Sequence, residues 1–140
     1  DRSCHTFSIT GEPDSVADIH REIDQFCRQN GIPRSRGVFL AIAFEEAALN
    51  IINHNEHVSM IDICLLLEEG SLIVRIRDDG APFDPLAFVD DEDILQMNNI
   101  RLLERLTDQK TYTRIMNMNN TVLSIRLEAA ENDGANDGTC

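Results

Sequence analysis

The sequence predicts an α+β fold: a two-layer α/β sandwich in which a mainly antiparallel sheet is covered on one face by three helices. Three observations lead to this prediction. The predicted helices and strands are grouped along the chain instead of alternating one by one. Apolar residues recur every three or four positions in the helical segments and every second position in the strands. Short turn-forming stretches join two pairs of neighbouring strands as hairpins, and hairpin strands are antiparallel.

The first part of the chain predicts one strand and two helices. Residues 5–10 alternate as a short strand, and residues 11–14 form a turn that starts a helix. Asn30-Gly31 ends this helix, because glycine readily takes the backbone conformation found after a helix C-terminus. A second helix runs from Arg34 or Ser35 to His54. The apolar positions of the first helix fall on one face: Val16, Ile19, Ile23, Phe26 and Cys27.

The remaining part predicts two hairpins separated by a loop and a third helix. The loop contains two prolines and several aspartates and has no periodicity. The second helix of the first part, which ends at His54, has so wide an apolar surface that we expect it to be buried on more than one side. The predicted elements of this part are strands 60–68 and 72–77, the loop 78–93, helix 94–106, strands 111–116 and 121–127, and the connection 117–120 between those last two strands.

Length and charge limit the classes of function. The chain has 140 residues, enough for one domain, which we place at residues 1–127, followed by an acidic flexible tail at 128–140. The formal net charge is −13, and such a surface repels phosphate backbones and anionic lipid. We therefore expect neither nucleic acid nor a membrane as a partner. No membrane-spanning run or signal-peptide pattern is present in the sequence, so we expect a cytoplasmic location.

The four cysteines do not form a metal-binding or disulfide pattern. No two of them are spaced as a CxxC pair, and Cys27 and Cys64 lie inside apolar patterns. The sequence predicts that they are buried, reduced thiols.

One polar stripe lies on the otherwise apolar second helix. Glu46, Asn50 and His54 are four residues apart and share one helix face. A carboxamide oxygen is a hard ligand for Mg²⁺, and a carboxylate one turn away can orient a water molecule or accept a proton. The alternative interpretation is an exposed polar stripe with no chemistry.

A second group of polar residues begins at the end of a predicted strand, in the segment 76–85. The carboxylate of Asp78 can accept a hydrogen bond from an exocyclic amine such as that of adenine. Gly80 lets a ring approach the backbone closely. The alternative interpretation is a proline-rich turn with ordinary aspartates.

Together these two segments resemble the N-box and the first glycine box of the histidine-kinase-like (GHKL) ATPases, which have the Bergerat ATP-binding fold. The helix contains E-A-A-L-N at residues 46–50 with His54 four positions later, and the loop contains D-D-G-A-P-F-D-P at residues 78–85. The most similar branch is that of the anti-sigma factor serine/threonine kinases. The resemblance extends from about residue 5 to residue 127.

The resemblance implies ATP and Mg²⁺ as cofactors and a role for each matching residue. Asn50 would ligate Mg²⁺, and Glu46 would be the base that takes the proton from the substrate serine. Asp78 would bind the adenine amine, and Gly80 would shape that pocket. His54 would either touch phosphate or cap the end of its helix.

The sequence departs from the family at the second glycine box. The corresponding segment, residues 96–101, contains no glycine. Asn98 and Asn99 are the residues that could substitute in part, because asparagine tolerates a positive φ better than most residues. Arg101 could add positive charge near the γ-phosphate. Residues 89–93 place four carboxylates in the expected lid.

The resemblance implies an ATP-dependent kinase that phosphorylates a small STAS-type antagonist protein and binds a sigma factor or similar regulator. It also allows a homodimer. The alternative is a non-catalytic protein-binding module with the same fold and weak or lost ATP binding, which the missing glycines favour. A third hypothesis is an ATPase domain of another signalling protein, such as a phosphatase or a sensor kinase.

Overall fold

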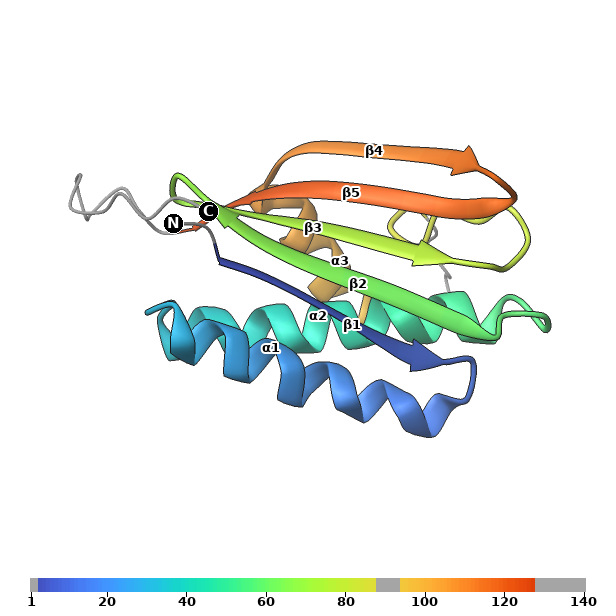
Figure 1. Ribbon diagram of the computed structural model, residues 1–140, viewed down its shortest axis with the longest axis horizontal. Coiled ribbons are helices and arrows are strands. Elements are labelled where there is room, and N and C mark those ends of the chain that lie inside the picture. The colour runs from blue at the N-terminus through green and yellow to red at the C-terminus, as the bar shows by residue number, and fades with distance from the viewer. Residues whose placement is uncertain (1–2, 88–93, 128–140) are drawn as a thin grey trace.

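The computed structural model describes residues 3–87 and 94–127, with the backbone alone over residues 94–98. Five strands form one antiparallel sheet in the order β1-β2-β3-β5-β4. The helices lie against one face of this sheet, as predicted (Figure 1). The elements are β1 (Ser3–Thr10), the 3-10 helix η1 (Pro13–Val16), α1 (Ala17–Gln29), α2 (Arg34–Asn53), β2 (Met60–Glu68), β3 (Ser71–Asp78), α3 (Ile94–Leu106), β4 (Thr107–Ile115) and β5 (Met118–Arg126).

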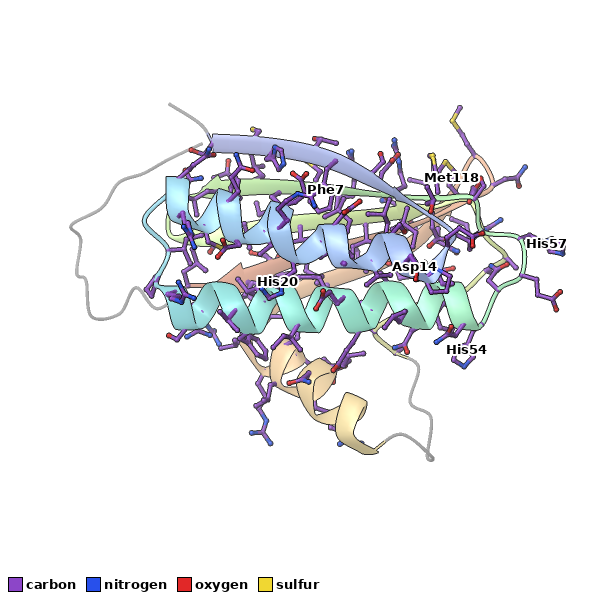
Figure 2. All side chains as sticks on the ribbon, turned by 90° about the horizontal axis from the view of Figure 1, so that it is seen from below. Phe7, Asp14, His20, His54, His57 and Met118 are labelled. Atoms are coloured by element: carbon purple, nitrogen blue, oxygen red, sulfur yellow. The ribbon has the colours of Figure 1, made fainter. Side chains whose placement is uncertain are left out.

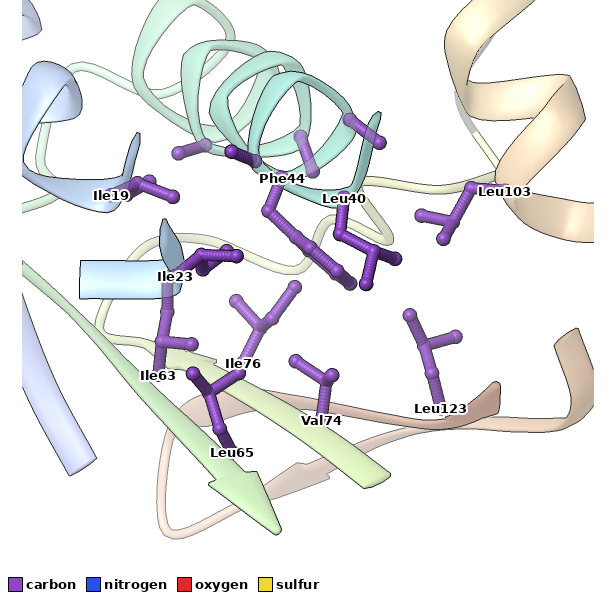
Figure 3. Packing of buried hydrophobic residues seen from close by; sticks show 14 of the residues in the cluster. Ile19, Ile23, Leu40, Phe44, Ile63, Leu65, Val74, Ile76, Leu103 and Leu123 are labelled. Carbon is purple, nitrogen blue, oxygen red and sulfur yellow. The ribbon is translucent and has the colours of Figure 1, made fainter. Parts of the chain in front are cut away.

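The hydrophobic core lies between the sheet and the helices. Strand alternation turns every second side chain of β2, β3 and β5 toward the helical layer, where these side chains are buried. Figure 3 shows Phe44 and Leu40 of α2 above Val74 and Ile76 of β3, with Leu103 of α3 facing the sheet. Burial of these side chains is the main stabilising contribution, at about 1.5–3 kcal/mol for each large apolar residue.

Two polar residues occupy inward positions at one end of β3 and β5. The inward positions of β3 are Leu72, Val74 and Ile76, and the next inward position is Asp78. On β5 the inward positions continue to Asn119. Because Asp78 and Asn119 are paired across the two strands, one buried carboxylate and one buried amide lie side by side at the same end of the sheet.

The second predicted hairpin differs from the observed one. The connection is a two-residue turn at Met116-Asn117, where φ is 52° and 65°, and not the segment 117–120. Strand β4 also begins at Thr107, four residues before the predicted start. The prediction was wrong because methionine is not a residue expected at positive φ, so the sequence pattern favoured the asparagines as the turn.

The predictions of burial for Cys4 and Cys64 were also wrong, and Cys4 is exposed. Cys27 is buried as expected, and its burial, with a smaller contribution from Asp24, raises the pKa of its thiol to about 11. Cys64 is half-buried, because it occupies an outward position of β2 between the buried Ile63 and Leu65. The outward face of β2 also carries Asp62, so strand alternation does place Cys64 outward, and the expectation of burial rested only on the apolar neighbours of Cys64.

No helix in the described part of the chain is long and apolar enough to cross a membrane. The predicted lid, residues 89–93, and the predicted tail, residues 128–140, lie outside the described residues.

Candidate functional site

The site begins at Asp78, the last residue of β3. Its side chain is only 1% exposed. Oδ1 of Asp78 accepts hydrogen bonds from the backbone N–H of Gly80 and from Nδ2 of Asn119, both at 2.9 Å. Burial raises the pKa of Asp78, and these two hydrogen bonds oppose the rise because they favour the charged carboxylate. The end of β3 therefore presents a buried acceptor that is held in a fixed orientation.

Gly80 lies in a closely packed position. A Cβ atom at this position would lie 2.1 Å from Nδ2 of Asn55 and 2.7 Å from Cγ2 of Val58. The segment after α2 thus packs closely against Gly80, and the predicted approach of a ligand ring to Gly80 stays a prediction. The neighbouring Asp79 fastens the same segment, since its carboxylate accepts hydrogen bonds from the backbone N–H of Ser59 at 2.9 Å and of Met60 at 3.2 Å.

The loop after Gly80 connects the strand end to α2. The ring of Phe83 stacks on the imidazole of His54, with centroids 5.5 Å apart and an interplanar angle of 10°. Nδ1 of His54 lies 3.0 Å from the backbone oxygen of Asn50. Figure 2 shows His54 at the same end of the molecule as Met118, the first residue of β5. The stacking contact thus brings the C-terminal end of α2 against the loop that follows Asp78.

Asn50 of α2 contacts this loop through a side-chain hydrogen bond. Its side chain is 8% exposed, and Nδ2 donates a long hydrogen bond of 3.5 Å to the backbone oxygen of Pro85. Because an amide group is planar, this contact turns Oδ1 away from Pro85, as a hard metal ligand would need.

The residues present fit Mg²⁺ only when substrate supplies further ligands. In the described ranges no group of three or more His, Cys, Asp or Glu residues is placed to hold a metal ion. Mg²⁺ commonly uses one or two protein ligands together with water and substrate phosphates. Asn50 fits that type of site, and a metal site made by protein groups alone does not.

Comparison with known families agrees with this arrangement. The family model for the histidine kinase-like ATPase domain matches residues 9–127. The chain belongs to this family. A comparison with curated proteins found no match.

The match covers both halves of the site. In this histidine kinase-like ATPase domain, the matched region contains the end of β1, all of β2 to β5 and all three helices. The two halves are connected through the loop after Gly80: Asp78 bonds Asn119, Asn119 bonds the backbone of Phe83, and Phe83 stacks on His54. The structure thus brings Asp78, Gly80, His54 and Asn50 around one loop.

Glu46 faces α3. Its Oε1 accepts a hydrogen bond of 2.7 Å from Nδ2 of Asn99. Asn99 was predicted to lie near phosphate, and in the structure its amide contacts the predicted base. Arg101 is exposed on α3, and the side chain of Asn98 lies outside the described residues. The roles predicted for these residues stay predictions.

The region of the second glycine box is helical. Residues 96–101 lie inside α3, so Asn98 and Asn99 have helical backbone and not the positive φ of a glycine-rich loop. The segment that was predicted to lie near phosphate is therefore helical as well as free of glycine.

Sequence reasoning missed three residues that contact the site. Asn119, Tyr112 and Arg114 all bond the loop after Gly80 or its neighbours. Tyr112 and Arg114 lie in the predicted strand 111–116, to which no role was given, and Asn119 lies in the predicted connection 117–120. The alternation of β5 would have placed Asn119 inward if the hairpin turn had been predicted at its true position.

Proposed function

We propose that this domain is an ATP-binding serine/threonine protein kinase of the anti-sigma factor type. It would phosphorylate a small STAS-type antagonist protein and bind a sigma factor or similar regulator. The observation that supports this most directly is the pairing, around one loop, of a buried carboxylate at a strand end with a buried carboxamide on α2.

The strand end suits adenine. An ionised carboxylate can only accept hydrogen bonds, and the exocyclic amine of adenine is a donor. Both hydrogen bonds that Asp78 accepts within the described residues fall on Oδ1. This geometry supports a role for Oδ2 as the acceptor for the purine amine.

The helix side suits the transfer of a phosphoryl group. Phosphoryl transfer asks the protein mainly to position the reactants and to stabilise charge. Mg²⁺, when bound, would neutralise charge on the phosphate oxygens, and Asn50 is the residue that would hold it. Glu46 lies one helical turn before Asn50, and the hydrogen bond from Asn99 orients its carboxylate. We assign Glu46 as the base that accepts the proton of the substrate hydroxyl.

The second candidate function is a protein-binding module that has lost productive nucleotide binding. The helical, glycine-free backbone over residues 96–101 specifically favours it, because the backbone N–H groups beyond the first turn of α3 are used by the helix itself. The two functions share the fold and the partner surface, and they differ in whether Mg-ATP binds.

Calorimetry with Mg-ATP tests the proposal. The native chain is expected to bind, and Asn50→Ala and Asp78→Asn are each expected to weaken binding at least about tenfold. A native chain that shows no binding would leave the binding module as the function.

Phosphate transfer tests the assignment of the base. We expect labelled Mg-ATP to phosphorylate a STAS-type antagonist domain, and Glu46→Gln to reduce transfer by about 10²–10⁴-fold with nucleotide affinity kept. Glu45→Gln is the matched control, because Glu45 precedes Glu46 and lies 3.9 Å from His20 on α1. Equal activity of the two variants would exclude Glu46 as the base, and replacement of the acceptor serine by alanine checks the position of transfer.

A further inference from the structure

Three neighbouring strands place a carboxylate, an amide and a guanidinium in one row. Asp78 on β3 is paired with Asn119 on β5, and Asn119 is paired with Arg114 on β4. These strands are adjacent in the sheet, and the row lies near the β4–β5 turn (Figure 1). The site residue Asp78 is thereby connected to the edge strand, although Arg114 is far from it in sequence.

Asn119 uses both ends of its amide within this row. Nδ2 donates to Oδ1 of Asp78 at 2.9 Å and to the backbone oxygen of Ala81 at 2.8 Å. Oδ1 accepts from the backbone N–H of Phe83 and from Nη1 of Arg114, both at 3.2 Å, and from the hydroxyl of Tyr112. The side chain is 1% exposed, and these partners leave it one orientation.

Asn119, Tyr112 and Arg114 hold the loop after Asp78. Nη1 of Arg114 donates to the backbone oxygen of Gly80 at 2.7 Å. The hydroxyl of Tyr112 accepts from the backbone N–H of Phe83 at 3.0 Å. The backbone of residues 80–83 is therefore fastened to the β4–β5 hairpin at several points, and we call Asn119, Tyr112 and Arg114 the hairpin clasp.

We propose that Asn119 and Arg114 are positioning residues for purine recognition, which set the preference for adenine over guanine. By occupying Oδ1 of Asp78, Asn119 directs the other oxygen to the ligand. Adenine offers an amine donor at the position where guanine has an oxygen, and a fixed carboxylate accepts the first and repels the second. Arg114 acts through Asn119 and the backbone of Gly80. This inference rests on the proposed function, because it requires that the site binds a purine nucleotide.

Charge in the row supports the same conclusion. The hydrogen bond from Asn119 and the positive charge of Arg114 both lower the pKa of Asp78 against the effect of burial. Removal of either group favours a protonated Asp78, and a protonated carboxyl can donate to the oxygen of guanine.

The test compares Mg-ATP and Mg-GTP binding by calorimetry for the native chain, Asn119→Ala and Arg114→Gln. We expect the native chain to prefer Mg-ATP. Asn119→Ala should weaken Mg-ATP binding about tenfold or more and Mg-GTP binding much less, so the ratio of the two affinities falls. Arg114→Gln should change the ratio in the same direction by a smaller factor. The matched control is Arg126→Gln, an arginine on β5 that pairs with Asp108 away from the clasp, and its ratio should equal the native one.

Hydrogen exchange supplies a readout that does not depend on nucleotide. In Asn119→Ala the amide of Phe83 should exchange at least about tenfold faster than in the native chain, while amides in the centre of β3 keep their rates. If Asn119→Ala does not fold, Arg114→Gln alone decides, because Arg114 is an exposed residue.

The outcomes separate the two proposals. A native chain that binds neither nucleotide overturns the proposed function, and the inference about purine choice with it. A native chain that binds Mg-ATP, with variants that bind both nucleotides as the native chain does, overturns the inference alone. Equal weakening of Mg-ATP and Mg-GTP also overturns it, because that result indicates a structural role without an effect on specificity.

Discussion

The site has a strand end, around Asp78 and Asn119, and a helix side, around Asn50 on α2. The two differ in how many hydrogen bonds their buried polar side chains make within the protein. Asn119 takes part in five hydrogen bonds with Asp78, Ala81, Phe83, Tyr112 and Arg114. On α2, the side chain of the buried Asn50 makes one long hydrogen bond of 3.5 Å within the described residues. The side chains of the strand end are thus held in place by the protein itself, whereas the side chain of Asn50 on the helix side has few bonds within the protein and is suited to ligate a metal ion.

This difference matches the chemistry expected at each end. A purine has a fixed donor pattern, so a rigid acceptor recognises it with little loss of entropy. A triphosphate and its metal ion bring many oxygen ligands and water molecules of their own. We infer that base choice is fixed by the fold, and that the phosphate side is completed by the ligand. The following predictions test that division, beginning with the largest effect.

Replacing Asp78 by asparagine should change the affinity for Mg-ATP and the stability of the fold in opposite directions. Asp78→Asn is expected to weaken Mg-ATP binding by about 10²-fold, because the amine donor of adenine would then meet an amide whose oxygen is already used by Gly80 and Asn119. The free energy of unfolding of the ligand-free chain at neutral pH should instead rise by roughly 0.5–2 kcal/mol. Calorimetry and urea unfolding measure the two effects, and a variant that is less stable than the native chain at pH 7 would contradict the second.

The pH dependence of that stability difference has a definite sign. Burial raises the pKa of Asp78 in the folded chain, so between the unfolded pKa, about 3.9, and the folded pKa the native state binds more protons than the unfolded state. Native stability from this group therefore falls as the pH rises through that window. Asp78→Asn lacks this titrating group. Its gain in free energy of unfolding over the native chain should therefore be near zero below this pH window and complete above it. Urea unfolding across pH 3.5–8 checks this, and an advantage that shrinks with rising pH would be evidence against it.

Gly80→Ala should destabilise the strand end by about 1–3 kcal/mol, the usual cost of inserting a methyl group into a packed region. The new Cβ would meet side-chain atoms of Asn55 and Val58. Gly11→Ala should cost more, because its Cβ would lie 1.9 Å from the backbone oxygen of Val58, and backbone moves less easily than a side chain. Unfolding midpoints order the two variants, and adding Asn55→Ala to Gly80→Ala should recover part of the loss. Equal costs for the two glycines would contradict this account.

The order and limits of most elements could be predicted from the sequence. Apolar spacing predicted α3 at its observed bounds, residues 94–106, and β2 at residues 60–68. Alternation predicts the face of a strand only when its two faces differ in polarity. In β2 the outward face carries Asp62 and Glu68, so its alternation does assign Cys64 to that face. The prediction of burial followed instead the apolar residues on either side of Cys64.

The motif residues of the site could be predicted, but the clasp could not. Asp78 and Asn50 lie in segments that resemble known motifs, whereas Asn119 becomes part of the site only through the register of β3 and β5. That register depends on a turn with Met116 at positive φ. Positive φ is sterically unfavourable for methionine, so residue preferences do not predict a turn at Met116. The strand pairing of the whole hairpin outweighs this local cost.

The smallest expected effect lies at the helix side. Asn99→Ala removes the hydrogen bond to Oε1 of Glu46, which joins α3 to α2. We expect a loss of about 0.5–1.5 kcal/mol in the free energy of unfolding and a modest fall in phosphate transfer, with Mg-ATP affinity within about threefold of native, because ligand atoms and not Asn99 complete this side. Exposed Leu102 on the same helix supplies the control, Leu102→Ala, which should leave transfer unchanged. A loss of Mg-ATP binding in Asn99→Ala as large as that in Asp78→Asn would show that the helix side is as preorganised as the strand end, and the division between the two ends would not hold.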